Sequence, residues 1–320
     1  RRWSSRRRPP GLPAGRRPGS PPPTGDARGR AGRHLLPVPT SPADLESLRA
    51  EMARIAAALQ DEVCAAIERL DGEARFTTDR WERPGGGGGV TRVLQDGAVV
   101  EKAGVNVSDV HGPMPPRLAA RLGADGGAFG AAGLSIVVHP RSPLVPTAHA
   151  NVRFVARGGT GGFGGGADLT PCYLFDEDCA HFHRVLKDLC ERHLPGRHAA
   201  LKRAADAYFW LPHRAEHRGV GGIFFEDLDV APDRGLALAR DLPRAFLAAW
   251  LPIVARRAHL PFGEEERRWQ EIRRGRYVEF NLVQDRGTLF GLETGGRTES
   301  ILMSLPPRVR FPYDARPAPG

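Results

Sequence analysis

A run of glycines followed by a single carboxylate occupies residues 161–171, with the sequence GGFGGGADLTP. Glycine-rich turns often bind phosphate through backbone N–H groups, but such loops end in Gly-Lys-Ser or Gly-Lys-Thr, and this one has no lysine. Asp168 would also repel a phosphate. Because glycine lets a backbone approach a ligand closely, the pattern suits a flat ligand that offers N–H donors to Asp168. The alternative interpretation is a flexible loop in which Asp168 caps a helix.

Histidines recur at positions where imidazoles from separate elements could meet. His139 and His149 stand at the ends of apolar segments, residues 181–183 are HFH, and residues 213–217 are HRAEH. The spacing of the two histidines in HRAEH suits one helix face, but the zinc-protease motif has a glutamate directly after the first histidine, and arginine stands there in this sequence. Imidazoles from four elements would suit a divalent metal. The alternative is that each is an ordinary core or surface histidine.

Several arginines stand beside glycines or inside apolar segments, and a guanidinium binds a carboxylate through two parallel hydrogen bonds. Arg153 lies in the apolar segment ANVRFVA, and Arg297 follows Gly295 and Gly296. These two arginines favour a ligand that carries carboxylates. The remaining arginines in such contexts are expected to form surface ion pairs; they are Arg214, Arg218, Arg274 and Arg276.

The basic charge of the chain is confined to its start. Residues 1–34 hold ten arginines and one acid, Asp26, and so carry the whole formal net charge of +9. The remainder is neutral overall, which argues against a nucleic-acid partner. No apolar run reaches the roughly 18 residues of a membrane helix, so no integral membrane segment is expected.

Residues 1–40 are rich in arginine, proline and glycine and are expected to be a disordered leader. Arginine-rich, acid-poor leaders are typical of transit peptides, which predicts a plastid or mitochondrial location. If the leader carries no address, the protein is expected in the cytoplasm. The absence of an initiator methionine indicates a fragment.

The elements that must position these residues follow from periodicity. Apolar spacing predicts a helix from Pro42 to about Leu70, capped by Ser41. Residues 90–105 predict two strands joined at Asp96-Gly97, and residues 134–140, 150–156 and 221–228 predict further strands. Other helices are expected at 176–193, 197–210, 236–259 and 264–274, and a second hairpin at 276–292. Adjacent strand pairs favour an α+β fold with an antiparallel sheet, as a single domain at 41–320.

Six long motifs occur in order along this domain: GGGGGVTRVLQDGAVVEKAGVNVSDVHG, HANVRF, FGGGADLTP, PHRAEHRGVGGIFFEDL, RRGRYVEFNLVQDRGTLFGL and TGGRTESILMSLPP. Together they resemble the oxygen-dependent coproporphyrinogen III oxidases over about residues 41–312. The resemblance implies a large flat antiparallel sheet covered on both faces by helices. It also implies oxidative decarboxylation of two propionates of coproporphyrinogen III to vinyls, which gives protoporphyrinogen IX, CO2 and H2O2 for haem and chlorophyll synthesis. Oxygen is the implied co-substrate, with no organic cofactor.

The resemblance also implies residue roles. His149 and Asp168 are the implied catalytic residues, with Asp168 accepting hydrogen bonds from the pyrroles, and which of them takes the pyrrole proton stays open. The implied substrate-binding residues are Ser135, Asn151, Val152, Arg153, Gly295, Gly296 and Arg297. Relatives that use a divalent metal imply His139, His149, His183 and His213 as its ligands, and the sequence does not decide whether a metal is needed. Glu226-Asp227 replaces the usual Asp-Asp of one strand, with little effect expected.

A homodimer is expected through about Tyr277–Pro312 and Val105–Met114. The predicted hairpin at 276–292 has apolar residues on both faces, and a monomer seldom leaves so large an apolar patch uncovered. The alternative functions are a protein that binds or carries a tetrapyrrole without turnover, and a metal-dependent decarboxylase that needs no oxygen.

Overall fold

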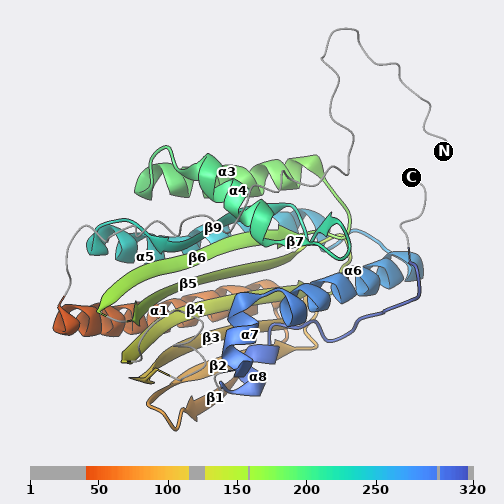
Figure 1. The fold of residues 1–320 in the computed structure, drawn as a ribbon. Helices are drawn as coiled ribbons and strands as arrows, with labels where there is room; N and C mark the ends of the chain where they lie inside the picture. Colours follow the sequence, from red (N-terminus) through yellow and green to blue (C-terminus); the bar gives the residue numbers. More distant parts are fainter. Residues whose placement is uncertain (1–40, 115–126, 158, 294–295, 316–320) are drawn as a thin grey trace.

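The computed structural model describes residues 41–114, 127–157, 159–293 and 296–315 (Figure 1). The predicted leader at 1–40 and Gly295 lie outside these residues. The main sheet has seven strands in the order β1-β2-β3-β4-β5-β6-β9, and all neighbouring strands are antiparallel. Its strands are β1 (Thr77–Glu82), β2 (Gly87–Gln95), β3 (Val100–Pro113), β4 (Ala128–Pro140), β5 (Thr147–Arg157), β6 (Thr160–Thr170) and β9 (Gly221–Leu228). The expected α+β class with an antiparallel sheet is confirmed.

One face of the sheet is covered by α1 (Pro42–Asp71) and α5 (Pro232–Arg257), and α3 (Asp176–His193) packs on α5. The predicted cap of α1 is present, since the Asp44 N–H donates to Ser41 Oγ at 3.2 Å. Alternate residues of β5, from Ala148 to Phe154, point into the core on this face, as a period of two requires. The intervening residues of β5 therefore point to the opposite face.

The opposite face carries α4 (His198–Tyr208), α6 (Glu264–Val283), α7 (Arg286–Glu293) and α8 (Thr298–Leu302), with α7 and α8 in front of the sheet in Figure 1. Phe209, Phe224 and Phe280 join α4, β9 and α6 in a second apolar cluster. Met303, just after α8, covers Gly104 of β3 so closely that a Cβ there would lie 2.5 Å from the Met303 sulfur. Helices thus cover both faces, as predicted. A separate pair of short strands, β7 (Trp210–Leu211) and β8 (Glu216–His217), follows α4.

The predicted hairpin at 276–292 is wrong, because this segment forms the C-terminal part of α6 and most of α7. Its buried residues Tyr277, Phe280 and Asn281 follow helical steps of three and four, and the buried asparagine interrupts the apolar pattern on this face.

The helix predicted at 264–274 continues through Gly275 to Val283 in α6, and a Cβ at Gly275 would come within 2.8 Å of the Arg310 carbonyl. The glycine therefore allows the C-terminal segment to cross α6 closely. Asp285 begins α7 instead of a hairpin turn, because its Oδ2 accepts the Thr288 N–H at 2.7 Å. None of the described helices is long and apolar enough to cross a membrane.

Candidate functional site

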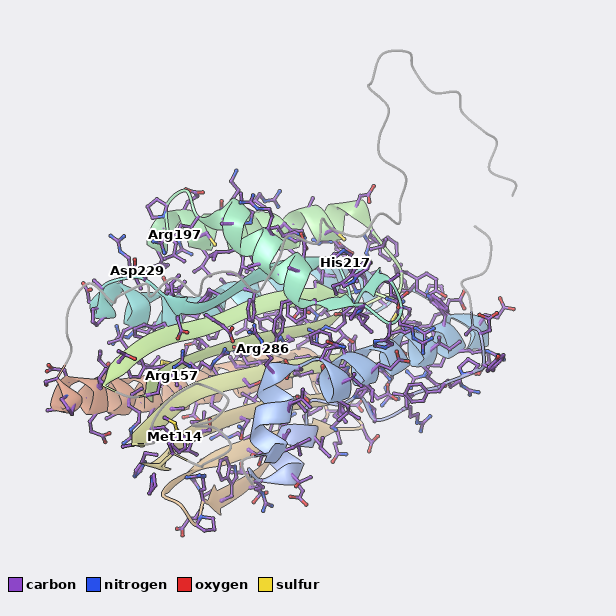
Figure 2. All side chains as sticks on the ribbon, in the orientation of Figure 1. Met114, Arg157, Arg197, His217, Asp229 and Arg286 are labelled. Atoms are coloured by element: carbon purple, nitrogen blue, oxygen red, sulfur yellow. The ribbon has the colours of Figure 1, made fainter. Side chains whose placement is uncertain are left out.

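A cavity of about 680 Å³ lies on the face of the sheet that carries α6, α7 and α8. Strands β3, β4, β5, β6 and β9 contribute to its lining, together with residues of these helices. Three of its lining residues, Met114, Arg157 and Arg286, are labelled in Figure 2. The volume falls within the range of about 300–1,000 Å³ that is typical of small-molecule sites.

Strand alternation brings the polar residues of β5 into this cavity. His149, Asn151 and Arg153 line it, while the residues between them belong to the core. The adjoining strand β6 contributes glycines, and a Cβ at Gly164 would lie 3.1 Å from the Arg153 guanidinium carbon. The glycine run is therefore a strand whose bare backbone leaves room for arginine and ligand. The alternative of a flexible loop with Asp168 as a helix cap is wrong.

Asp168 lies beneath His149 as its cross-strand neighbour. Its Oδ1 is 2.8 Å from His149 Nδ1, and its Oδ2 accepts a hydrogen bond of 2.6 Å from Arg218 Nη2. Burial alone would raise the pKa of the Asp168 carboxyl, but the Arg218 charge and the His149 hydrogen bond lower it below its ordinary value. An ionised Asp168 can only accept, so the His149 proton sits on Nδ1. In this tautomer Nε2 carries the lone pair, and it accepts a hydrogen bond of 3.3 Å from Asn151 Nδ2.

Arg218 is enclosed by aromatic rings. Its guanidinium carbon lies 4.2 Å from the ring centroid of Phe209, 4.5 Å from that of Tyr277 and 4.6 Å from that of Phe280. Nη1 donates to Asn281 Oδ1 at 3.1 Å, and the side chain is only 3% exposed. The expectation that Arg218 forms a surface ion pair is therefore wrong. No local pattern marks its burial, since its partners come from β6 and α6.

The other arginines of that group divide between surface and core. Arg214 pairs with Glu279 at the surface, as expected. Arg274 was expected at the surface too, but it is buried, with Nη1 2.7 Å from Glu101 Oε2. The Arg274 guanidinium connects α6 to β3, because Arg274 lies on the face of α6 that points to the sheet. Arg276 pairs with Glu216 and Glu279 and is mostly buried.

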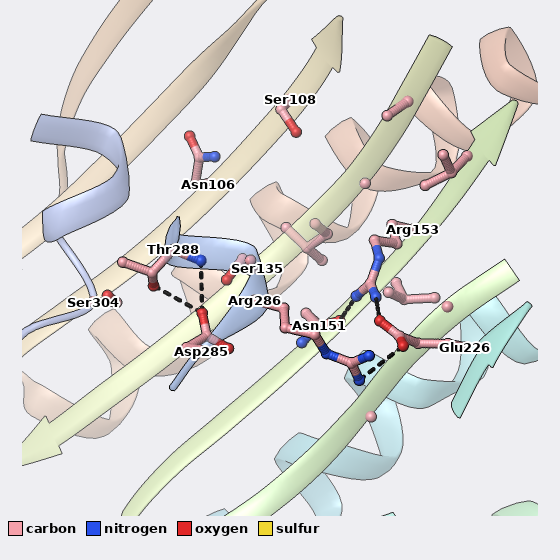
Figure 3. Close-up of a pocket in the computed structure, with 18 of the residues that line it drawn as sticks. Asn106, Ser108, Ser135, Asn151, Arg153, Glu226, Asp285, Arg286, Thr288 and Ser304 are labelled. Atoms are coloured by element: carbon pink, nitrogen blue, oxygen red, sulfur yellow. Dashed lines mark hydrogen bonds and ion pairs between the residues drawn. The ribbon is translucent and has the colours of Figure 1, made fainter. Parts of the chain in front are cut away.

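A second carboxylate lies between two guanidiniums at the cavity wall (Figure 3). Glu226 Oε1 is 3.0 Å from Arg153 Nη2, and Glu226 Oε2 is 2.8 Å from Arg286 Nη2. Arg153 Nη1 also donates to Asn151 Oδ1 at 2.9 Å. Arg153 stands out in the sequence because it lies in an apolar segment, whereas no local pattern marks Arg286, whose partner Glu226 is brought to it only by the fold. The cavity can thus bind carboxylates through arginines and hold an oriented imidazole next to them.

A family model described as coproporphyrinogen III oxidase matches residues 51–320. The chain belongs to the coproporphyrinogen III oxidase family. It is therefore an oxidoreductase of porphyrin biosynthesis, and coproporphyrinogen III is the substrate that fits this family. The matched region includes every residue that lines the cavity.

The other residues implied to bind coproporphyrinogen III are distributed unevenly. Ser135 lines the cavity opposite Asn151, its partner in the neighbouring strand. Val152 contributes to the lining from a strand position whose side chain is buried in the main core. Gly296 donates its N–H to the Gly291 carbonyl at 2.8 Å. Arg297 is not among the lining residues and pairs with Asp79 of β1, 2.9 Å from Nε.

The four histidines implied as metal ligands in this oxidase family do not converge here. Apart from His149, each is engaged separately: His139 Nε2 lies 2.9 Å from the Ser304 carbonyl, His183 Nε2 lies 3.2 Å from the Val220 carbonyl, and His213 Nε2 lies 3.0 Å from Glu279. Within the described ranges, no three His, Cys, Asp or Glu side chains are grouped to hold a metal ion. The arrangement therefore does not fit the implied metal set.

Proposed function

We propose that the protein catalyses the oxygen-dependent conversion of two propionates of coproporphyrinogen III to vinyls, giving protoporphyrinogen IX for haem or chlorophyll synthesis. For each group, the propionic acid and one O2 give a vinyl, CO2 and H2O2, so O2 is the oxidant. No organic cofactor is part of this proposal, and no step depends on a metal. The observation that carries it is the cavity, where guanidiniums stand beside an imidazole oriented by a buried carboxylate.

The geometry supports distinct roles for His149 and Asp168. Both oxygens of Asp168 already accept hydrogen bonds from protein groups, so Asp168 acts by orienting the imidazole. His149 Nε2 then takes the pyrrole proton. The resulting electron-rich pyrrole reduces O2 to a peroxide, which takes a β-hydrogen from the adjacent propionic acid. As CO2 leaves, its electron pair forms the vinyl, H2O2 departs with the β-hydrogen and the acid proton, and His149 returns its proton to the pyrrole nitrogen.

Arg153 and Arg286 supply charge for the propionates, and Ser135 and Asn151 supply polar contacts on the same wall. Because Arg153 is fixed by Asn151, its fork is already oriented when the substrate arrives. Binding at such preorganised donors places the reacting propionate next to His149 and lowers the entropic part of the barrier.

The test is product analysis with coproporphyrinogen III in air and under anaerobic conditions. We expect protoporphyrinogen IX, CO2 and H2O2 in air, in a ratio of one CO2 and one H2O2 per vinyl, and no product without oxygen. Turnover without oxygen that a chelator abolishes would establish a metal-dependent decarboxylase. Stoichiometric binding without any product would establish a tetrapyrrole carrier.

We also propose a homodimer that pairs through residues of α6, α7 and the following segment, with help from Val105–Met114. The support is a group of exposed apolar side chains at the end of α6 and on α7: Leu282, Val283 and Leu292 are 40%, 57% and 39% exposed. We expect sedimentation at micromolar concentration to give a dimer, and Val283→Asp to weaken it. An active monomer of the native sequence would refute this contact.

For location, we propose that residues 1–40 act as a leader that directs the protein to a plastid or a mitochondrion. The support is their arginine-rich, acid-poor composition. A fluorescent fusion of the leader should enter one of these organelles, whereas a diffuse cytoplasmic signal would contradict the proposal.

A further inference from the structure

Glu226 occupies a site built for a carboxylate. Its two oxygens are used separately, Oε1 by Arg153 and Oε2 by Arg286, at 3.0 and 2.8 Å (Figure 3). The side chain of glutamate is itself a propionate, the group that a coproporphyrinogen carries four times. Glu226 thus presents to two cavity arginines the same chemical group as the proposed substrate.

The two guanidiniums are held by other partners as well. Arg153 crosses the bare backbone at Gly164 and donates to Asn151 Oδ1 at 2.9 Å. The Arg286 guanidinium carbon lies over the rings of Tyr208 and Phe224, 5.0 and 5.8 Å from their centroids. Both arginines can therefore keep their positions when Glu226 leaves. A site that exchanges one carboxylate for another requires such fixed arginines.

Exposure separates this carboxylate from the permanent ones. The side chains of Glu226 and Arg153 are each 35% exposed and that of Arg286 is 52% exposed, whereas Asp168 and Arg218 are each 3% exposed. Water can solvate Glu226 as it swings away, so the cost of leaving is small. A carboxylate that only stabilised the fold would gain little from this position.

We propose that Glu226 is an internal competitor for a substrate propionate: it occupies the Arg153–Arg286 site in the free protein and is displaced when the tetrapyrrole binds. The inference rests on the proposed function for the identity of the ligand. Its consequence is selectivity, since a ligand must bring further carboxylates to displace a tethered one. The opposite view is that Glu226 stays in place and positions the two arginines for the ligand.

The two views predict opposite signs for Glu226→Gln, which keeps the size of the side chain and removes its charge. Displacement predicts that the variant lowers the Kd for coproporphyrin III, measured by fluorescence titration, by about three- to tenfold, as expected for losing two partly exposed ion pairs. The effect on turnover should fall on KM and not on kcat. Unchanged or weaker binding would overturn the proposal.

Two controls separate displacement from a general change in charge. Glu62 forms a similar exposed pair with Arg244 between α1 and α5, away from the cavity, so Glu62→Gln should leave Kd unchanged. In an Arg286→Ala background, Glu226→Gln should improve binding less than it does alone, because one of the contested guanidiniums is gone. Equal gains in both backgrounds would overturn the proposal.

The same titration distinguishes this inference from the proposed function. Coproporphyrin III is a stable analogue and its binding needs no turnover. Tighter binding by Glu226→Gln in a protein that releases no CO2 would support the inference and refute the oxidase. CO2 release with no binding gain would refute the inference and uphold the oxidase.

Discussion

Asp168 and Glu226 each lie between two groups that donate hydrogen bonds to them, and the two carboxylates differ in burial. Asp168 of β6 lies between Arg218 and His149, and the side chains of Asp168 and Arg218 are each 3% exposed. Glu226 lies between Arg153 and Arg286 at the cavity wall, and its side chain is 35% exposed. The same chemistry is thus used once in the interior and once beside water.

The difference in burial decides what each carboxylate can do. Removing one partner of a buried ion pair leaves the other charge buried and unpaired, which costs several kcal/mol. Asp168 and Arg218 are therefore expected to stay paired when a ligand binds. An exposed pair is worth about 1 kcal/mol or less, so the Glu226 group can exchange with a ligand. A buried ion pair therefore orients a reacting group, and an exposed one can select what binds.

The largest effect is expected for Asp168→Asn. The change removes the charge opposite Arg218 and replaces one of two accepting oxygens by a donating NH2, so the side chain cannot accept from both Arg218 and His149, and kcat/KM should fall about a hundredfold or more. The free energy of unfolding should fall by about 3 kcal/mol. Kinetics in air and urea unfolding check both. Turnover by the variant within threefold of that of the native protein would show that Asp168 is no more essential to the reaction than the exposed Glu226.

Arg218→Lys should have the next largest effect, about tenfold or more on kcat. Lysine keeps the charge but cannot bond Asp168 and Asn281 together while stacking on three rings. The loss should exceed that of Arg214→Lys, a surface control paired with Glu279. Equal kinetics for the two lysine variants would show that burial of Arg218 does not matter.

A smaller effect, on binding, is expected for Arg153→Lys. A point charge replaces a fork that reaches both Glu226 and Asn151, so KM should rise about tenfold or less, while the free energy of unfolding changes by less than about 1 kcal/mol. Steady-state kinetics and urea unfolding separate the two quantities. A loss of stability as large as that of Asp168→Asn would place Arg153 with the permanent groups.

The smallest effect on activity is expected for Glu279→Gln, which removes a pair outside the cavity. Hydrogen bonds from Arg214 lower the Glu279 pKa from 4.5 to about 2 against the effect of burial. A lowered folded pKa means that this stabilisation is complete above pH 4.5 and is lost as the pH falls toward about 2. At pH 7 the free energy of unfolding of the variant should be about 1 kcal/mol lower than that of the native protein. As the pH falls from 4.5 toward about 2, the variant should lose less of its free energy of unfolding than the native protein does. Urea midpoints at several pH values check this, and identical pH profiles would contradict it.

The strands that carry the site could be predicted because their signals are local. Alternation over ANVRFVA identifies a strand, and the same alternation puts His149, Asn151 and Arg153 on one face. The segment at 276–292 failed for the converse reason. Its inward face includes a polar residue whose partner lies elsewhere in the chain, Asn281 with Arg218, so no unbroken apolar period marks the helix.

The sequence by itself determined the α+β class, the first helix, most strands and the motifs that identify the family. The apolar context of Arg153 singled it out, and the family resemblance implied Ser135 and Asn151; all three line the cavity. Only the tertiary structure decided that Arg218 is buried against Asp168 and that Glu226 bridges Arg153 and Arg286. The physical reason is that burial and pairing of a charge depend on groups 50 or more residues away, which packing alone brings within hydrogen-bond distance.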